Sequence, residues 1–298
     1  MILDPNSLPV PELHAFLLGT IGPRPIAWAS TIDKDGKVNL APYSFFNVFG
    51  TKPPTLIFSP AIPRGGNRKD TLLNVLETEE VVINIVDYKI VEQMSLSSTA
   101  YPKGTNEFIK AGLTEAPSEK VKPPRVAEAI AAYECKVKQV IHLGEEQGAG
   151  NLIICEILLG YVKDEVLGED GKPDPKKTDL VARMGGDWYC RANGDALFQI
   201  PKPNRNLGIG VDQIPDAIRN SSVLTGNNLG RLGNIEKMPE NEAVEAFSLT
   251  DEIVTLNDRF SNNQAGFVNA LHNLAQKYLE NNQLEKAWLT LLQTPKKL

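Results

Sequence analysis

The residues best suited to chemistry lie in one stretch, Arg24 to Phe46, where small and polar side chains follow a predicted hairpin. Runs 26–32 and 38–41 are typical of strands. Residues 33–36, which end in Gly, favour a tight turn between them, because Gly adopts positive φ without steric cost. Small side chains let a flat ligand approach the backbone, and short polar groups can hold its edge. An edge hairpin whose strand ends at Pro fits the same spacing. Residues of this kind stand where a core strand would carry Val or Ile: Asn39, Ala41, Pro42 and Ser44.

A second informative stretch, Arg64 to Thr71, places three cations and two glycines before the helical pattern of residues 72–77. The start of a helix offers free N–H groups and a partial positive charge, which suit a phosphate. Lys69 would add a charged donor, and Thr71 would add a hydroxyl. Asp70 would repel a phosphate, so we expect Asn67 or Asp70 to cap the helix. A solvated loop before an ordinary capped helix fits the same residues.

Composition excludes several classes of protein. The formal net charge of −6 disfavours a general nucleic-acid role, and no apolar run reaches membrane-spanning length. The first residues lack the basic region of a secretion signal, and the three cysteines form no CxxC pair, so we expect reduced thiols in a cytoplasmic protein. Three widely spaced histidines without clustered acids predict no metal site.

The chain is predicted to have two parts, residues 1–200 and residues 201–298. The first part alternates strand-like runs with loops, and its aromatic residues Phe45 and Phe49 are expected to pack at one end of the sheet. A Pro- and Gly-rich segment follows residue 200. Helical patterns then occur at about 212–220, 241–258, 262–280 and 283–293, with no internal repeat that defines a solenoid.

The motifs PRPIAWAS and NLAPYSFF, separated by the hairpin, resemble the signature of the flavin reductase-like family of FMN-binding split barrels. The likeness continues through FSP at 58–60, KDT at 69–71 and VKPPRVAEAIAAYECKV at 121–137, and it covers roughly Leu18 to Tyr189. It implies a mainly β fold with helices, namely a six-stranded antiparallel Greek-key barrel, to which this chain adds a C-terminal helical extension. It also implies a homodimer with FMN near the subunit boundary.

The same resemblance implies that hydride passes from NADH or NADPH to the flavin, and that electrons continue to an acceptor, which can be a protein. No catalytic side chain is expected, because the flavin ring carries the chemistry. The resemblance assigns FMN contacts as follows: Ser30 and Thr31 near the phosphate or ribityl chain; Asn39, Ala41, Pro42 and Ser44 along the ring; Ser59 beside the reactive nitrogen; and Arg64, Lys69, Asp70 and Thr71 at the phosphate.

Two other functions fit the sequence. One is a flavin-binding electron carrier, similar to flavoredoxin, without its own nicotinamide site. The absence of a clear dinucleotide-binding fingerprint agrees with this alternative and with the oxidoreductase. The other is a non-enzymatic assembly protein that uses the helical tail for binding. Uptake of FMN, and its reduction by NADH or NADPH, distinguish the three.

Overall fold

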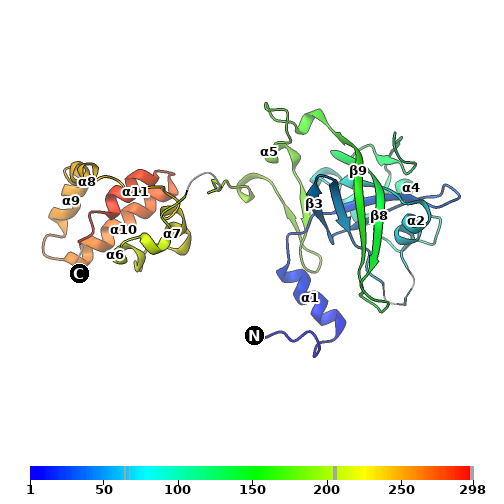
Figure 1. Cartoon of the computed structure of the whole chain (residues 1–298), viewed down its shortest axis with the longest axis horizontal. Helices are drawn as coiled ribbons and strands as arrows, with labels where there is room; N and C mark the ends of the chain where they lie inside the picture. The colour runs from blue at the N-terminus through cyan, green and yellow to red at the C-terminus, as the bar shows by residue number, and fades with distance from the viewer. Residues whose placement is uncertain (64, 67, 204–206, 296–298) are drawn as a thin grey trace. The chain divides into compact units, whose positions relative to one another are not determined.

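A computed structural model of the chain describes residues 1–63, 65, 66, 68–203 and 207–295. The chain divides into two compact units, Met1–Phe198 and Gln199–Leu298 (Figure 1). Among the described residues, no helix combines the length and the apolar character that crossing a bilayer requires.

Unit 1 is built on a seven-stranded antiparallel sheet with the strand order β2-β1-β5-β8-β9-β4-β3. The two longest strands, β8 and β9, lie side by side in its middle (Figure 1). Apolar residues line one face of both strands, as expected for a sheet that covers a core. The strands are β1 Ala27–Ile32, β2 Val38–Tyr43, β3 Phe46–Thr51, β4 Pro54–Phe58, β5 Glu80–Ile85, β8 Ala131–His142 and β9 Asn151–Val162.

The sheet curls until its two edges approach each other. Strands β2 and β3 are the edges, yet only Ser44 and Phe45 separate them in the chain. Three residue steps span at most about 11 Å, so these edges must be close at that point. The predicted six-stranded barrel is therefore replaced by a curled seven-stranded sheet. The difference arises because Phe46–Thr51, predicted only as aromatic packing, pairs with β4 as a further strand.

Two cores lie on the two faces of this sheet. The inner core contains Ala27, Ala29 and Phe58, and helix α2 (Asp70–Thr78) packs into it through Leu72 and Val75. The outer core contains side chains of the opposite parity on β1 and β2, and helices α3 and α4 cover it. Alternation along the strands thus decides which core each residue joins. The outer core includes Trp28, Leu40, Met94 of α3 (Val91–Ser97) and Phe108 of α4 (Glu107–Ala111).

Unit 1 also exposes apolar surface. Helix α1 (Val10–Thr20) buries none of its residues, and the edge region around β3 exposes Phe45 (39%), Val48 (59%) and Phe49 (64%). The predicted packing of Phe45 and Phe49 inside one chain is therefore wrong, because β3 is an edge strand with no neighbour beyond it. The remaining elements of this unit are β6 Glu115–Ala116, β7 Arg125–Val126, β10 Val181–Arg183, β11 Tyr189–Arg191 and α5 Pro175–Thr178.

Unit 2 is helical and has its own core. Trp288 lies at the centre of this core, with 1% of its surface exposed, and its indole Nε1 donates to the carbonyl of Leu232 at 3.2 Å. Helices α10 and α11 pack against each other, α9 lies beside α10, and α7 and α8 lie beside α11. The helices are α6 Asp216–Arg219, α7 Gly226–Leu232, α8 Asn241–Ser248, α9 Asp251–Arg259, α10 Gln264–Glu280 and α11 Leu284–Leu291.

The helix predicted over 241–258 is divided into α8 and α9. At the division, the Ser248 hydroxyl donates to the carbonyl of Glu245, and the Thr250 hydroxyl donates to the carbonyl of Phe247 at 2.8 Å. Such side-chain bonds compete with helix continuation, and the apolar periodicity gives no sign of the interruption.

Candidate functional site

The predicted hairpin and the start of α2 meet through a network of hydrogen-bonded side chains. The Asn39 amide donates to the Thr71 hydroxyl at 2.8 Å and to the Thr31 hydroxyl at 3.2 Å. Asn74, one turn further along α2, also donates to Thr31, at 3.0 Å. Strands β1 and β2 are thereby joined to the helix by polar contacts. The sequence interpretation omitted Asn74, although its spacing from Thr71 places it on the same helix face.

This junction is closed by the chain's own side chains. A cavity of about 10 Å³ remains between β2 and α2, lined in part by Asn39, Asp70 and Asn74 and by two lysines, Lys37 and Lys103. That volume holds about one water molecule. A group as large as a flavin ring therefore does not fit between the hairpin and the helix within one chain. Any such group must lie on the outer surface of the junction.

The strand register divides the predicted site residues between the two faces of the sheet. Thr31 pairs with Asn39 and belongs to the inner face, together with Ala41. Ser30 and Pro42 have the opposite parity and belong to the outer face, with Trp28 and Leu40. The structure thus brings Thr31, Asn39 and Thr71 together and separates their side chains from that of Ser30.

Two buried hydroxyls at this hairpin make no hydrogen bond with any described residue. One belongs to Ser30, which is fully buried, and the other belongs to Tyr43, at the end of β2. Burial raises the pKa of Tyr43, and the neighbouring Thr71 hydroxyl opposes that effect. Buried polar groups normally have partners, so each of these hydroxyls leaves a hydrogen-bonding position that a ligand or a water can fill.

A buried carboxylate accepts a hydrogen bond from the backbone of the hairpin. Glu107, the first residue of α4, accepts a hydrogen bond from the backbone N–H of Leu40 at 2.9 Å. Burial raises the pKa of Glu107 above its ordinary value, and the charge of Asp70 acts in the same direction. The sequence interpretation did not identify Glu107, because 67 residues separate it from the strand that it holds.

The start of α2 has the exposed Lys69 at its N-cap position, and no side chain caps the helix there. Asp70 is the first helical residue, so the prediction that it caps the helix is wrong. The alternative cap Asn67 lies outside the described residues, as does the predicted phosphate contact Arg64. Lys69 forms no ion pair with any residue in the described part of the chain. Its charge and the first N–H groups of the helix remain open to an anion.

Ser59 belongs to a different set of contacts. Its hydroxyl accepts from the backbone N–H of Asn151 at 2.9 Å, and its own N–H donates to the carbonyl of Phe45 at 2.9 Å. The Asn151 side chain in turn meets His142 Nδ1 at 2.6 Å. Ser59 thus lies beside the short connection between β2 and β3 and takes no part in the Asn39 network. Ser59 can lie beside the flavin ring, as predicted, only if the ring lies across the connection between β2 and β3.

The outer surface of the junction has features that fit a planar, phosphorylated group. Ala41, Pro42 and Ser44 are half-buried, and their small side chains leave the backbone open to a flat partner. An uncapped helix start with an exposed lysine follows in α2. The residues therefore fit such a group on the surface, where one side of it would remain uncovered by this chain.

Comparison with known proteins agrees with this geometry. Residues 20–176 match the sequence model of the flavin reductase like domain. A protein of Halalkalibacterium halodurans is 39% identical over 205 residues, which cover 68% of this chain and 97% of that protein. The crystal structure of nitrilotriacetate monooxygenase component B from Bacillus cereus is similar, with a TM-score of 0.63 and 30% identity, over 67% of this chain and 98% of that one. A putative flavin reductase with a split barrel domain from Shewanella frigidimarina has a TM-score of 0.58 and 29% identity, over 68% of this chain and 99% of that one.

The curled antiparallel sheet of unit 1 is similar to the fold of a flavin reductase-like protein with a split barrel domain. The chain belongs to the flavin reductase-like domain family, and the predicted family is thereby confirmed.

Proposed function

We propose that this protein binds FMN and acts as an oxidoreductase that takes hydride from NADH or NADPH and passes electrons to an acceptor. The observation that carries the proposal is the bonded junction between the β1–β2 hairpin and the start of α2, in a member of a flavin-binding family. When bound, the flavin supplies the two-electron chemistry, so the chain needs only to hold and orient it.

In this proposal the ring lies on the surface formed by Ala41, Pro42 and Ser44, with Ser59 near its reactive nitrogen. Backbone N–H groups face the pyrimidine edge, where negative charge grows during reduction, and the Asn39 side chain, whose amide donates to Thr31 and Thr71, positions the strand that carries them. The Thr31–Asn39–Thr71 contacts keep these donors in place before the ligand arrives, which lowers the entropic cost of binding.

The phosphate lies at the start of α2 in this proposal. Lys69 supplies a positive charge, the first N–H groups of α2 supply donors, and the helix dipole favours an anion there. Thr71 lies at the phosphate end in this proposal, and the backbone of Ser30 and Thr31 lies nearest the phosphate or the ribityl chain. The side chains of all three are buried, so Thr31 and Thr71 act by holding the hairpin against the start of α2. Asp70, the first residue of α2, would repel the phosphate and does not contact it directly in this proposal. Arg64 completes the predicted set.

A second copy of the chain is proposed to cover the open side of the site. The edge strand β3 exposes Val48 and Phe49, and α1 buries none of its apolar residues. Exposed apolar surface of this kind marks an interface. A homodimer formed over β3 would place the partner subunit against the connection between β2 and β3, next to Ser44.

The free thiols Cys135 and Cys155, both buried, agree with a cytoplasmic location.

The experiment that tests this function is anaerobic stopped-flow reduction of the purified protein loaded with FMN. We expect the flavin absorbance near 450 nm to bleach on mixing with NADH, with NADPH or with both. Bleaching by dithionite but by neither nicotinamide would show an electron carrier instead. Protein that takes up no FMN at all would remove the basis of both functions.

Replacement of Lys69 by alanine should weaken FMN binding by roughly tenfold or more, because one charge-assisted contact to phosphate is lost. The fold should be unaffected, since the side chain is exposed. Quenching of FMN fluorescence measures the affinity. Lys122→Ala, at another exposed lysine, is the control and should bind as the wild type does. Equal affinities for the two variants would contradict the phosphate position.

A further inference from the structure

Unit 2 lies outside the part of the chain that defines the family. The family match ends at residue 176, whereas unit 2 begins at Gln199. The relative from Halalkalibacterium halodurans is matched over 97% of its own length by 205 residues of this chain, so it has no room for a unit of this size. Unit 2 buries its own core around Trp288 and Leu271, which shows that it is a folded module. Unit 2 is therefore a candidate for a function other than binding the flavin.

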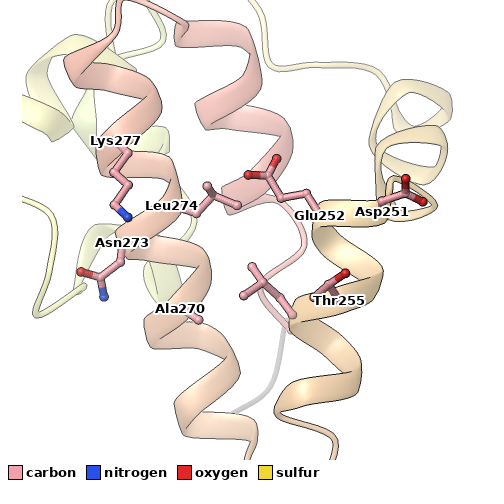
Figure 2. Close-up of a pocket in the computed structure, with 8 residues that line it drawn as sticks. Asp251, Glu252, Thr255, Ala270, Asn273, Leu274 and Lys277 are labelled. Carbon is pink, nitrogen blue, oxygen red and sulfur yellow. The ribbon is translucent and has the colours of Figure 1, made fainter.

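The surface of unit 2 contains a groove of about 510 Å³ between α9 and α10 (Figure 2). Helix α9 buries only Ile253, so it leaves a space beside α10. Leu256 and Ala270 line this space, and Leu274 points into it from α10 (Figure 2). A volume of this size is typical of sites that take several side chains of a ligand.

A hydrogen bond between α9 and α10, the two helices that line the groove, fixes their spacing. The hydroxyl of Tyr278 on α10 donates to the carboxylate of Glu252 on α9. Burial raises the pKa of Tyr278 to about 12, and the Glu252 carboxylate acts in the same direction, so this hydroxyl keeps its proton at neutral pH. On the other side of the unit, the Gln293 amide on α11 donates to the carbonyl of Val244 on α8 at 2.9 Å. The Tyr278–Glu252 contact joins the two helices that line the groove and gives it a defined shape before any ligand binds, and the Gln293–Val244 contact joins two other helices of the unit.

The wall formed by α9 carries two carboxylates on the groove, Asp251 and Glu252, and the wall formed by α10 carries one cation, Lys277. Glu252 accepts a hydrogen bond from the Tyr278 hydroxyl. Asp251, on the groove, forms no ion pair with any residue that the structure describes. An apolar floor of Leu256, Ala270 and Leu274 beside the carboxylate of Asp251 complements a ligand that carries an apolar side chain next to a positive charge.

The helix pair α10–α11 has apolar residues at the spacing of a single tetratricopeptide helix pair, and most of them pack in the core of unit 2. The tetratricopeptide pattern has a large apolar residue, then Leu-Gly three residues on, then Tyr, and a second helix with Ala and an aromatic residue four positions later. The first helix here has Leu271, Leu274, Ala275 and Tyr278 at that spacing, and the second has Ala287 and Leu291. The groove lies on the first helix of the pair.

We propose that this groove binds an extended peptide segment of a partner protein, in which an apolar side chain lies next to lysine or arginine. The apolar side chain enters between Leu256 and Leu274, and its basic neighbour pairs with Asp251. Lys277, on the opposite wall, donates to a backbone carbonyl of the segment. The proposal concerns unit 2 alone and does not depend on flavin chemistry in unit 1.

Fluorescence anisotropy with the full-length protein tests this proposal. The probe is a short labelled peptide in which arginine alternates with leucine, and two control peptides carry glutamate for arginine or serine for leucine. We expect saturable binding of the first peptide and at least tenfold weaker binding of both controls. Asp251→Lys should weaken binding of the probe about tenfold. Thr255→Trp, at an exposed position on the groove, should abolish it by filling the space.

Asp258→Lys, on the same helix but outside the groove, is matched in charge to Asp251→Lys and should leave the affinity unchanged within about twofold. Circular dichroism checks that each variant is folded. If Thr255→Trp does not fold, the comparison of Asp251→Lys with Asp258→Lys is sufficient to test the proposal. Absence of saturable binding, or equal binding by Asp251→Lys and Asp258→Lys, would overturn the proposal. Sedimentation that shows a smaller assembly for Thr255→Trp than for the wild type would identify a second copy as the occupant and overturn it as well.

Discussion

Replacement of Glu134 by alanine should destabilise unit 1 by about 3 kcal/mol or more. Glu134 lies on β8 with none of its surface exposed, and its carboxylate is the acceptor for a whole loop. The backbone N–H of Glu119 donates to it at 2.9 Å, that of Val121 at 3.3 Å, and the Tyr161 hydroxyl at 2.8 Å. Without the carboxylate, several hydrogen bonds are lost together, and the N–H of the buried Val121 stays without a partner, which costs more than the loss of an ordinary hydrogen bond.

The measurement is thermal unfolding followed by circular dichroism, in which the melting temperature of unit 1 should fall by roughly 6–12 °C. Glu156→Ala is the matched control on the neighbouring strand β9. Its carboxylate pairs with Lys138 at 3.1 Å near the surface, so its removal should cost at most about 1 kcal/mol. A melting temperature for Glu134→Ala within the range of this control would show that the loop does not depend on the carboxylate.

The same carboxylate should make stability depend on pH in the acid range. Burial by itself would raise the pKa of Glu134, but the hydrogen bonds that it accepts hold the pKa below its ordinary value of 4.5. The unfolded chain therefore binds the proton more readily than the folded chain does. The stabilisation by Glu134 is fully present above pH 4.5 and is lost as the pH falls through the lower, folded-state pKa. Glu134→Ala should lack this component, so the stability difference from the wild type should narrow towards low pH.

Replacement of Trp288 by alanine should destabilise unit 2 by roughly 3–5 kcal/mol and leave unit 1 unchanged. The indole is buried in the helical core and donates to the carbonyl of Leu232, so the substitution leaves a cavity and removes a hydrogen bond. Hydrogen exchange measured peptide by peptide should show faster exchange in 209–295 and unchanged exchange in 27–162, because the two units have separate cores.

Trp188 offers the control, because 78% of its surface is exposed. Trp188→Ala should change the stability of either unit by no more than about 0.5 kcal/mol. The melting temperature of unit 2 should fall by roughly 12 °C or more in Trp288→Ala alone. If Trp288→Ala accelerated exchange in β5 and β8 as strongly as in α10, the two units would unfold as one, contrary to the prediction.

Local pattern sufficed for the regular elements that carry strong signals. The runs predicted as strands at 26–32 and 38–41 correspond to β1 and β2. The predicted turn is present, with Gly36 at a φ of +81°. The family was also evident from residues alone, because its motifs combine short polar groups and glycines that ordinary strands lack. Periodicity could not show that Phe46–Thr51 forms an edge strand, because edge strands satisfy their hydrogen bonds through pairing decided elsewhere in the chain.

The amino-acid sequence by itself determined the first hairpin, most of the helical segments and the family to which the chain belongs, since these depend on residues close together in the chain. Only the tertiary structure decided which side chains meet. It joined Asn39 to Thr71, buried Glu107 beneath Leu40, and left a groove between α9 and α10. The physical reason is that strand register and helix packing fix contacts between residues tens of positions apart, and these depend on the whole core.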